Sequence, residues 1–396
     1  MLSRRRTHDF VPPRAVELRF SDGRRPDWLL DDASCRVPLP PGRPRELPGE
    51  PLVYGRDGAH EVPLISQHEG EVHAAYDWRQ WRRFVARQVY AAPHKRPLFT
   101  RLPVHYHHAP AILRNLAAEL LAPSAEEGAT PFPGYPIEQG FEALRFARQV
   151  AKGEGTKRDG HVVLTHDVDT SAGLEWVRDI AELEMAFGFR SQWNIVGCHY
   201  PLDYRTLDWL VDNGHEIGLH GFNHDCKLAF LSDGEIRRRF DRCQTLMARY
   251  DMLGFRSPGY YRSFTLSRVV RDYFEYDLTF LDADWICVGG KGGCLSARPF
   301  VLDGVAIIPT TMSTEYMMTP GGLKVGYDAD YWRQKARWLR AVGGDAVVNT
   351  HSEPNLSGNE RGLGAYRSLL EDLNVVFEGS WALPRELLDD ARGDVL

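Results

Sequence analysis

The sequence predicts an α/β protein, in which a distorted (β/α) barrel of about seven parallel strands follows an N-terminal α+β extension. After residue 160, short β-rich runs alternate with amphipathic helical stretches, which is the pattern of βαβ units and a parallel sheet. About seven such units are present, a number that suits a closed or nearly closed barrel. The 396-residue chain is also longer than an average domain, so we expect one large domain with an appended region.

The N-terminal extension is expected to comprise residues 1–155, and the sequence indicates no role for it. Residues 37–51 are rich in proline, which lacks an amide donor and restricts its predecessor, so this linker or wrapping arm should be extended or turn-forming. Gly153 and Gly155 mark the end of the last helix of the extension, and we place the domain boundary there. Apolar residues at helical spacing predict helices in residues 78–89, 112–121 and 138–150.

The barrel is expected to span residues 156–396. In such barrels the reactive groups gather at the carboxyl ends of the strands, so the residues that follow each strand are candidates for catalysis. The predicted strands are residues 161–164, 191–196, 215–219, 254–256, 278–281, 305–308 and 347–349. The predicted helices are residues 174–187, 204–213, 233–250, 267–273 and 328–342.

Composition excludes several classes of partner. The net charge is −6 and charges of both signs are mixed along the chain, so no broad cationic face is available for nucleic acid. No apolar run approaches the roughly 20 residues of a membrane helix, which leaves peripheral contact as the only membrane association. The basic residues 4–6 lack the apolar run of a secretory signal, and the six cysteines form no CxxC pair. We therefore expect a soluble, cytoplasmic protein with reduced thiols, and the sequence carries no signal for its oligomeric state.

Two carboxylates, Asp167 and Asp169, stand just beyond the first predicted barrel strand. In an extended segment, residues two apart point to the same side, with their Cα atoms about 6.6 Å apart. One carboxylate can then bind a cation while the other acts on a bound water. The alternative is that Asp169 or Thr170 caps the helix that begins near Gly173.

Two histidines four residues apart, His220 and His224, follow the predicted strand at residues 215–219. Such a pair lies on one face of a helix or converges across a tight loop, and neutral imidazole is the commonest protein ligand for zinc-like ions. Taken alone, the pair is also compatible with plain surface or core histidines. Together with a carboxylate from a neighbouring strand, it leaves coordination positions open, as a catalytic metal site requires.

Three further positions carry candidate chemistry. The guanidinium fork of Arg256 can hold Asp167 bidentately and keep it ionised, although a surface arginine before a loop is the alternative. Asp284 and Trp285 set a carboxylate beside an apolar wall, or form a plain turn. His351 ends the last predicted strand and is a candidate acid for a leaving amine, or a structural histidine.

The order of these motifs resembles that of the polysaccharide deacetylase family, carbohydrate esterase family 4 with its NodB-homology domain. The resemblance covers about residues 160–387, roughly the last 60% of the chain. Two departures are present: Val168 separates carboxylates that are adjacent in the family, and Gly221 replaces the usual hydroxyl residue of the histidine motif. The five family motifs have counterparts at residues 165–169, 220–224, 256–258, 284–285 and 351.

The resemblance implies a metal site and a base. Asp169, His220 and His224 would hold one divalent metal ion, with zinc as the first choice and cobalt, nickel, manganese or iron as alternatives. Asp167 would be the base that takes a proton from water. Because Val168 lies between the two carboxylates, a swap of their roles stays open.

The resemblance also implies how the acyl group is handled. A backbone N–H near Gly259 or Tyr260 would meet the developing oxyanion. His351, oriented by Asp284 and bordered by Trp285, would protonate the departing amine. His199 lies in a loop expected to border the barrel mouth and is a further candidate for substrate contact.

The expected function is therefore a metal-dependent N-deacetylase that hydrolyses the acetamido group of an N-acetylated sugar in a polysaccharide, lipid-linked or nucleotide-linked glycan. One alternative is a catalytically weak carbohydrate-binding protein of the same fold, which the presence of both acid and base candidates disfavours. The other is a non-haem iron oxygenase with the same two-histidine, one-carboxylate ligands. That alternative predicts a β-sandwich and leaves Asp167, Arg256 and His351 without roles.

Overall fold

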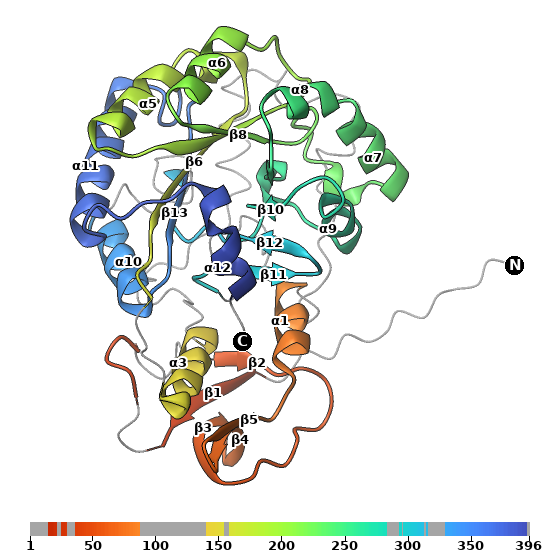
Figure 1. Ribbon diagram of the computed structural model, residues 1–396, viewed down its shortest axis with the longest axis vertical. Coiled ribbons are helices and arrows are strands. Elements are labelled where there is room, and N and C mark those ends of the chain that lie inside the picture. The colour runs from red at the N-terminus through yellow and green to blue at the C-terminus, as the bar shows by residue number, and fades with distance from the viewer. Residues whose placement is uncertain are drawn as a thin grey trace, which may run out of the picture. The chain divides into compact units, whose positions relative to one another are not determined.

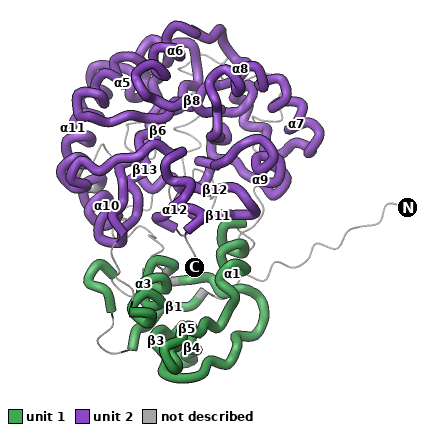
Figure 2. The backbone as a smooth tube through the Cα atoms, viewed as in Figure 1, with its two compact units in different colours: residues 1–95, 138–155 green, residues 96–137, 156–396 purple. Residues whose placement is uncertain are grey.

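The computed structural model describes residues 15–21, 25–29, 36–87, 140–153, 158–282, 293–294, 296–312, 314–315 and 329–393. The described residues form two compact units (Figure 2). Unit 1 contains those up to residue 95 together with those between residues 138 and 155, and unit 2 contains those from residue 156 onward. The assignment of the whole of residues 1–155 to one domain stays a prediction.

Unit 1 combines an antiparallel sheet with two helices. Trp81 in α1 (Trp78–Ala86) is fully buried, and its indole packs edge-on against Phe141 of α3 (Gly140–Lys152) with ring centroids 5.7 Å apart. These helices confirm two of the three predicted for the extension, and residues 112–121 lie outside the described residues. The sheet has the order β2-β1-β3-β4-β5, with β1 (Ala15–Phe20), β2 (Arg36–Pro38), β3 (Glu50–Asp57), β4 (His60–His68) and β5 (Glu71–Ala74).

Unit 2 is built on a curled eight-stranded sheet with the order β11-β12-β10-β9-β8-β7-β6-β13. All neighbouring pairs are parallel except β11 with β12, which leaves seven parallel strands as predicted. The amides of Thr311 and Met312, just after β12, donate to the Val347 carbonyl of β13, so the two ends of the parallel set approach each other. The strands are β6 (Val162–Val168), β7 (Ser191–Ile195), β8 (Glu216–Leu219), β9 (Gly254–Phe255), β10 (Tyr276–Asp277), β11 (Phe300–Leu302), β12 (Val305–Ile307) and β13 (Ala346–His351).

Helices surround the outside of this sheet (Figure 1). The helix predicted at residues 233–250 is divided by a short turn into α7 and α8, and the short helix α4 precedes the helix predicted at residues 174–187, which corresponds to α5. The strand predicted at residues 278–281 lies instead at Tyr276–Asp277. Aspartate is uncommon in strands, so the sequence pattern did not include Asp277, although the sheet buries this residue. The helices are α4 (Ser171–Leu174), α5 (Val177–Ala186), α6 (Tyr204–Asp212), α7 (Asp233–Asp241), α8 (Gln244–Arg249), α9 (Phe264–Val270), α10 (Ala329–Val342), α11 (Glu360–Val376) and α12 (Leu388–Gly393). Within the described ranges, none of the helices has the length and hydrophobicity that crossing a bilayer requires.

The strand register determines which polar residues meet. Every residue of β6 is buried, as expected for a parallel strand with both faces covered. Asp167 pairs with His351 on one neighbouring strand and with Asn194 on the other. Paired residues of parallel strands point to the same face of the sheet, so these three side chains gather at the carboxyl ends of β6, β7 and β13.

Candidate active site

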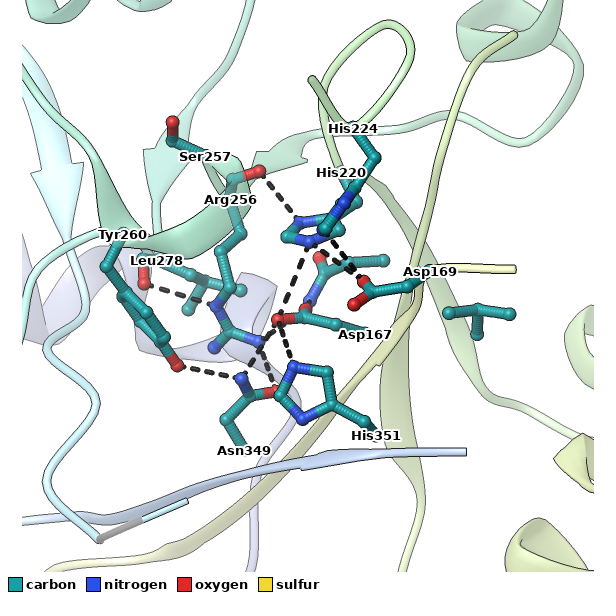
Figure 3. Close-up of polar contacts among 12 residues, drawn as sticks. Asp167, Asp169, His220, His224, Arg256, Ser257, Tyr260, Leu278, Asn349 and His351 are labelled. Atoms are coloured by element: carbon teal, nitrogen blue, oxygen red, sulfur yellow. Dashed lines mark hydrogen bonds and ion pairs between the residues drawn. The ribbon is translucent and has the colours of Figure 1, made fainter. Parts of the chain in front are cut away.

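The three predicted metal ligands converge. Asp169 Oδ1 lies 3.3 Å from His220 Nε2 and 3.0 Å from His224 Nε2 (Figure 3). Each residue offers one possible ligand atom, and these three atoms all lie within 4.8 Å of one another. All three side chains are buried. Asp169 Oδ1 accepts no hydrogen bond of ordinary geometry although it is buried, which is costly unless a cation compensates it. The donor set and this orphaned oxygen fit a divalent metal ion.

The alternative in which Asp169 or Thr170 caps a helix finds little support. Thr170 occupies the N-cap position of α4, but its side chain makes no capping hydrogen bond. The Asp169 carboxylate faces the two imidazoles instead. These contacts argue against the capping alternative, and the role of Asp169 as a metal ligand stays a prediction.

The tautomer of His220 follows from the hydrogen bond that its Nδ1 atom makes. Nδ1 lies 3.0 Å from the carbonyl oxygen of Arg256. Because a carbonyl only accepts, Nδ1 must carry the proton and donate it. Nε2 is then a lone-pair donor that faces Asp169, which is the form a metal ligand needs.

Gly221 is required by the backbone at this point of the histidine loop. Its φ is +71°, a left-handed conformation, and an added Cβ would lie 3.0 Å from Cδ of Pro258. A hydroxyl residue here would combine backbone strain with a tight contact. The departure from the family motif is thus built into the local geometry of this chain.

Asp167 is held by hydrogen bonds to both of its oxygens. Arg256 Nη1 donates to Oδ1 at 3.0 Å and Asn194 Nδ2 donates to the same oxygen at 2.9 Å. Asn349 Nδ2 donates to Oδ2 at 2.9 Å. A bidentate fork between Arg256 and Asp167 was expected, but only one guanidinium nitrogen reaches this carboxylate, since the others bond elsewhere.

The surroundings keep Asp167 ionised. Burial by itself would raise the pKa of this carboxyl, but the positive charge of Arg256 foremost, together with that of His351, holds the pKa well below its usual range. The Oδ2 atom lies 3.8 Å from His220 Nε2 and 3.8 Å from His351 Nε2. Asp167 therefore stands as an anion between the metal ligands and the candidate acid.

Arg256 connects the barrel interior to this carboxylate. Its side chain is 0% exposed. Its N–H groups also donate to Asn349 Oδ1 (2.7 Å), Thr165 Oγ1 (2.8 Å), Thr310 Oγ1 (3.4 Å) and the Leu278 carbonyl (3.3 Å). Contacts to several strands at once mean that the guanidinium has one allowed position, and so has the Asp167 carboxylate it holds.

The turn after β9 places Tyr260 beside Arg256. The guanidinium carbon lies 5.7 Å from the centre of the Tyr260 ring, and the Tyr260 hydroxyl accepts from Asn349 Nδ2 at 2.7 Å. The Tyr260 amide donates to the Ser257 carbonyl at 2.9 Å, so it is already engaged and does not point to an oxyanion. Gly259 is exposed with a φ of +63°, and its part in oxyanion binding stays a proposal.

His351 has a carboxylate partner that the sequence motifs did not reveal. Its Nδ1 lies 3.2 Å from Glu315 Oε2, and its backbone amide donates to the other oxygen of Glu315. Asp284 and Trp285 lie outside the described residues, so their predicted roles beside His351 stay predictions. Burial would lower the pKa of His351, but Glu315 and the two aspartates raise it to about 10. The imidazole is therefore protonated at neutral pH, as an acid must be.

Substituting Glu315 by Gln is expected to move the alkaline limb of the kcat profile to lower pH. The pKa of His351 is raised above its usual value, so the acid form persists until pH rises through that value. Without the anionic partner, only the two aspartates oppose the effect of burial, so the pKa of His351 falls and the proton leaves at a lower pH. The measurement is kcat against pH for E315Q and the unchanged chain. S357A, which removes a neutral 3.2 Å contact to Glu315, is the matched control, and an unmoved limb in E315Q contradicts the orienting role.

Glu353 is a second buried carboxylate that the motifs did not reveal. Its Oε1 accepts from the backbone amides of Asp169 at 2.7 Å and Thr170 at 2.9 Å, which holds the turn that carries the predicted metal ligand Asp169. Burial and the charge of Asp169 raise the pKa of Glu353 to about 8. A lone glutamate in a loop carries no sequence signal of this kind.

His199 lies in the loop after β7 and is half-buried. Its ring is edge-on to that of Tyr200 with centroids 6.2 Å apart, and the Tyr200 hydroxyl donates to the Val168 carbonyl at 2.6 Å. The loop is thus attached one residue before Asp169. Contact between His199 and a substrate stays a proposal.

Similarity to known proteins is found among solved structures. No protein-family model and no curated protein matches the sequence. Solved structures that match include a protein from Mycobacterium smegmatis assigned as a polysaccharide deacetylase, with 18% identity and a TM-score of 0.48 over 59% of this chain and 91% of that one. A family 4 carbohydrate esterase from Streptomyces lividans matches with 17% identity and a TM-score of 0.35 over 57% and 92%.

A third solved structure is the allantoinase Puue, with 14% identity and a TM-score of 0.45 over 59% of this chain and 90% of that one. The matches therefore include polysaccharide deacetylases, the family that the sequence motifs resemble. At these identities and TM-scores the likeness by itself assigns no activity to this chain.

Proposed function

We propose that this chain is a metal-dependent hydrolase that removes the acetyl group from an N-acetylated sugar. The observation that carries the proposal is the grouping of Asp169, His220 and His224 beside one buried anionic carboxylate and one cationic imidazole. Such a grouping contains a cation site, a base and an acid within one buried space.

Asp169, His220 and His224 would hold a divalent cation, which would supply Lewis acidity for activating water and polarising an acyl carbonyl. Zinc is the metal we propose, because two imidazoles and one carboxylate are typical zinc ligands. Asp167 accepts the proton of the attacking water. His351 donates its Nε2 proton to the nitrogen of the breaking amide bond, so that acetate and a free amine leave.

The substrate we propose is an acetamido sugar in a polysaccharide, lipid-linked or nucleotide-linked glycan. The names of the matched deacetylases and of the carbohydrate esterase suggest this class, and the motif resemblance agrees with it. The cytoplasmic location expected from the sequence stays a prediction, and it favours a glycan precursor.

The two alternatives make different predictions. An oxygenase with the same ligands was expected to have a β-sandwich, whereas unit 2 is a parallel α/β barrel. A binding protein without turnover would not need a base and an acid beside the cation site. The proximity of Asp167 Oδ2 to both His220 Nε2 and His351 Nε2, at 3.8 Å each, supports the hydrolase instead.

The test is acetate release by the full chain. Incubation with a panel of acetylated nucleotide sugars and lipid-linked glycans, with Zn²⁺ or Co²⁺, should liberate acetate and reduce the substrate mass by one acetyl group. A chelator should abolish the release and added metal should restore it. Allantoin is included as a non-sugar amide because of the allantoinase match. Oxygen uptake with 2-oxoglutarate, or sugar binding without any acetate, would overturn the proposal.

A further inference from the structure

The loop that carries both imidazole ligands has an unfavourable backbone. His224 has a φ of +51° and Cys226 has a φ of +54°, values that non-glycine residues rarely adopt. Each such residue is strained and persists only when its surroundings hold it in place. The metal ligand His224 therefore depends on contacts made by its neighbours.

Arg239 of α7 supplies those contacts. Its Nη1 donates to Asn223 Oδ1 at 3.2 Å and to Asp225 Oδ1 at 2.9 Å, the two residues on either side of His224. The Arg239 side chain is 13% exposed and that of Asp225 is 6% exposed, so this ion pair is little screened by solvent. Asp225 Oδ1 also accepts from the Lys227 amide at 3.1 Å, which ties down the far end of the loop.

An aromatic contact attaches the near end of the same loop to α7. The guanidinium carbon of Arg239 lies 5.8 Å from the ring centre of Phe222, and that of Arg242 lies 4.5 Å from it. One helix thus touches the residues at positions 222, 223 and 225. These contacts surround His224 in sequence on both sides.

The geometry points to Arg239 as a positioning residue that holds His224 in its metal-binding conformation. This inference rests on the proposed metal site. A hydroxyl side chain at position 221 would brace such a loop from within, but the left-handed backbone and Pro258 exclude it here. A cation from α7 performs that task from outside, and its removal should let the loop relax so that the His224 imidazole leaves its place.

The test is Co²⁺ binding to the full chain with R239A and R238A as a matched pair. Arg238 is the next residue on the same helix, is 75% exposed and pairs with Glu235, so R238A removes an arginine without touching the loop. We expect R239A to weaken Co²⁺ affinity by about 10–100-fold and to change the visible absorption spectrum of bound Co²⁺. R238A should leave both unchanged, and R239K should restore only part of the affinity because lysine lacks the planar fork.

The outcomes separate the inference from the proposed function. If the unchanged chain binds no Co²⁺, the proposed metal site is wrong. If it binds and R239A binds equally well with the same spectrum, the positioning role is wrong. Should R239A fail to fold by far-ultraviolet circular dichroism, D225N serves instead, because it keeps the shape and weakens the same ion pair. D225N with unaltered affinity and spectrum overturns the inference, and a weakened, spectrally altered site supports it.

Discussion

Replacing Asp167 by Asn should lower kcat by about 10²–10⁴-fold while the metal remains bound, because a positioned base contributes on that order to the rate. The Asp167 carboxylate is held by three hydrogen bonds and kept anionic by its neighbours, so it can accept a proton from water near the cation site. An amide of the same shape cannot accept that proton. The measurements are acetate release and metal content of the purified D167N chain.

D169N is the control for D167N, because Asp169 contacts both imidazoles directly. We expect D169N to lose the metal, and D167N to retain it. The reverse result would show that the two carboxylates have exchanged roles, the alternative that Val168 leaves open. Full turnover in D167N would remove Asp167 from the mechanism altogether.

The second large effect is expected for Arg256→Met. The guanidinium is 0% exposed, and its loss leaves the Asp167 carboxylate buried without its principal counter-charge. Removing one partner of a buried ion pair costs roughly 3–5 kcal/mol in the free energy of unfolding. Turnover should fall as well, since Asp167 would lose the contact that fixes its position. Denaturant unfolding at pH 7 and acetate release measure the two effects.

The pH dependence of R256M provides a further check. Arg256 lowers the pKa of Asp167 in the folded chain, so the stabilisation is fully present above the unfolded value and is lost as pH falls through the folded one. The stability difference between R256M and the unchanged chain should therefore shrink on acidification. Arg238→Met, an exposed replacement of the same size, is the control and should change stability little. An R256M chain as stable as the original at pH 7 would contradict the argument.

Several elements of the fold could not be predicted from the local sequence pattern. The five-stranded sheet of unit 1 was expected only as part of an α+β extension. Helix α11 was not predicted, since Gly362 and Gly364 lower helix propensity in its first turns although Asn359 caps it. Packing against other elements outweighs propensity in such cases. The strand at Tyr276–Asp277 illustrates the same effect, because its aspartate is buried by the sheet.

The sequence by itself determined the barrel and the side chains that meet at its rim. Residues that follow parallel strands share one edge of the sheet however far apart they lie along the chain, so strand positions alone brought Asp169, His220 and Arg256 into one group. The motif order then assigned Asp169 as ligand and Asp167 as base, an assignment that stays a prediction.

Only the tertiary structure decided which charged residues support that group. Glu315 is 36 residues from His351, Glu353 is 184 residues from Asp169, and Arg239 reaches the histidine loop from a separate helix. Each is a single charged residue without a periodic or motif context. Local patterns report what neighbours in the chain share, whereas these contacts depend on how distant segments pack. That packing buries Glu353, which raises its pKa, and it sets Glu315 beside His351, whose pKa the glutamate raises against the opposite effect of burial.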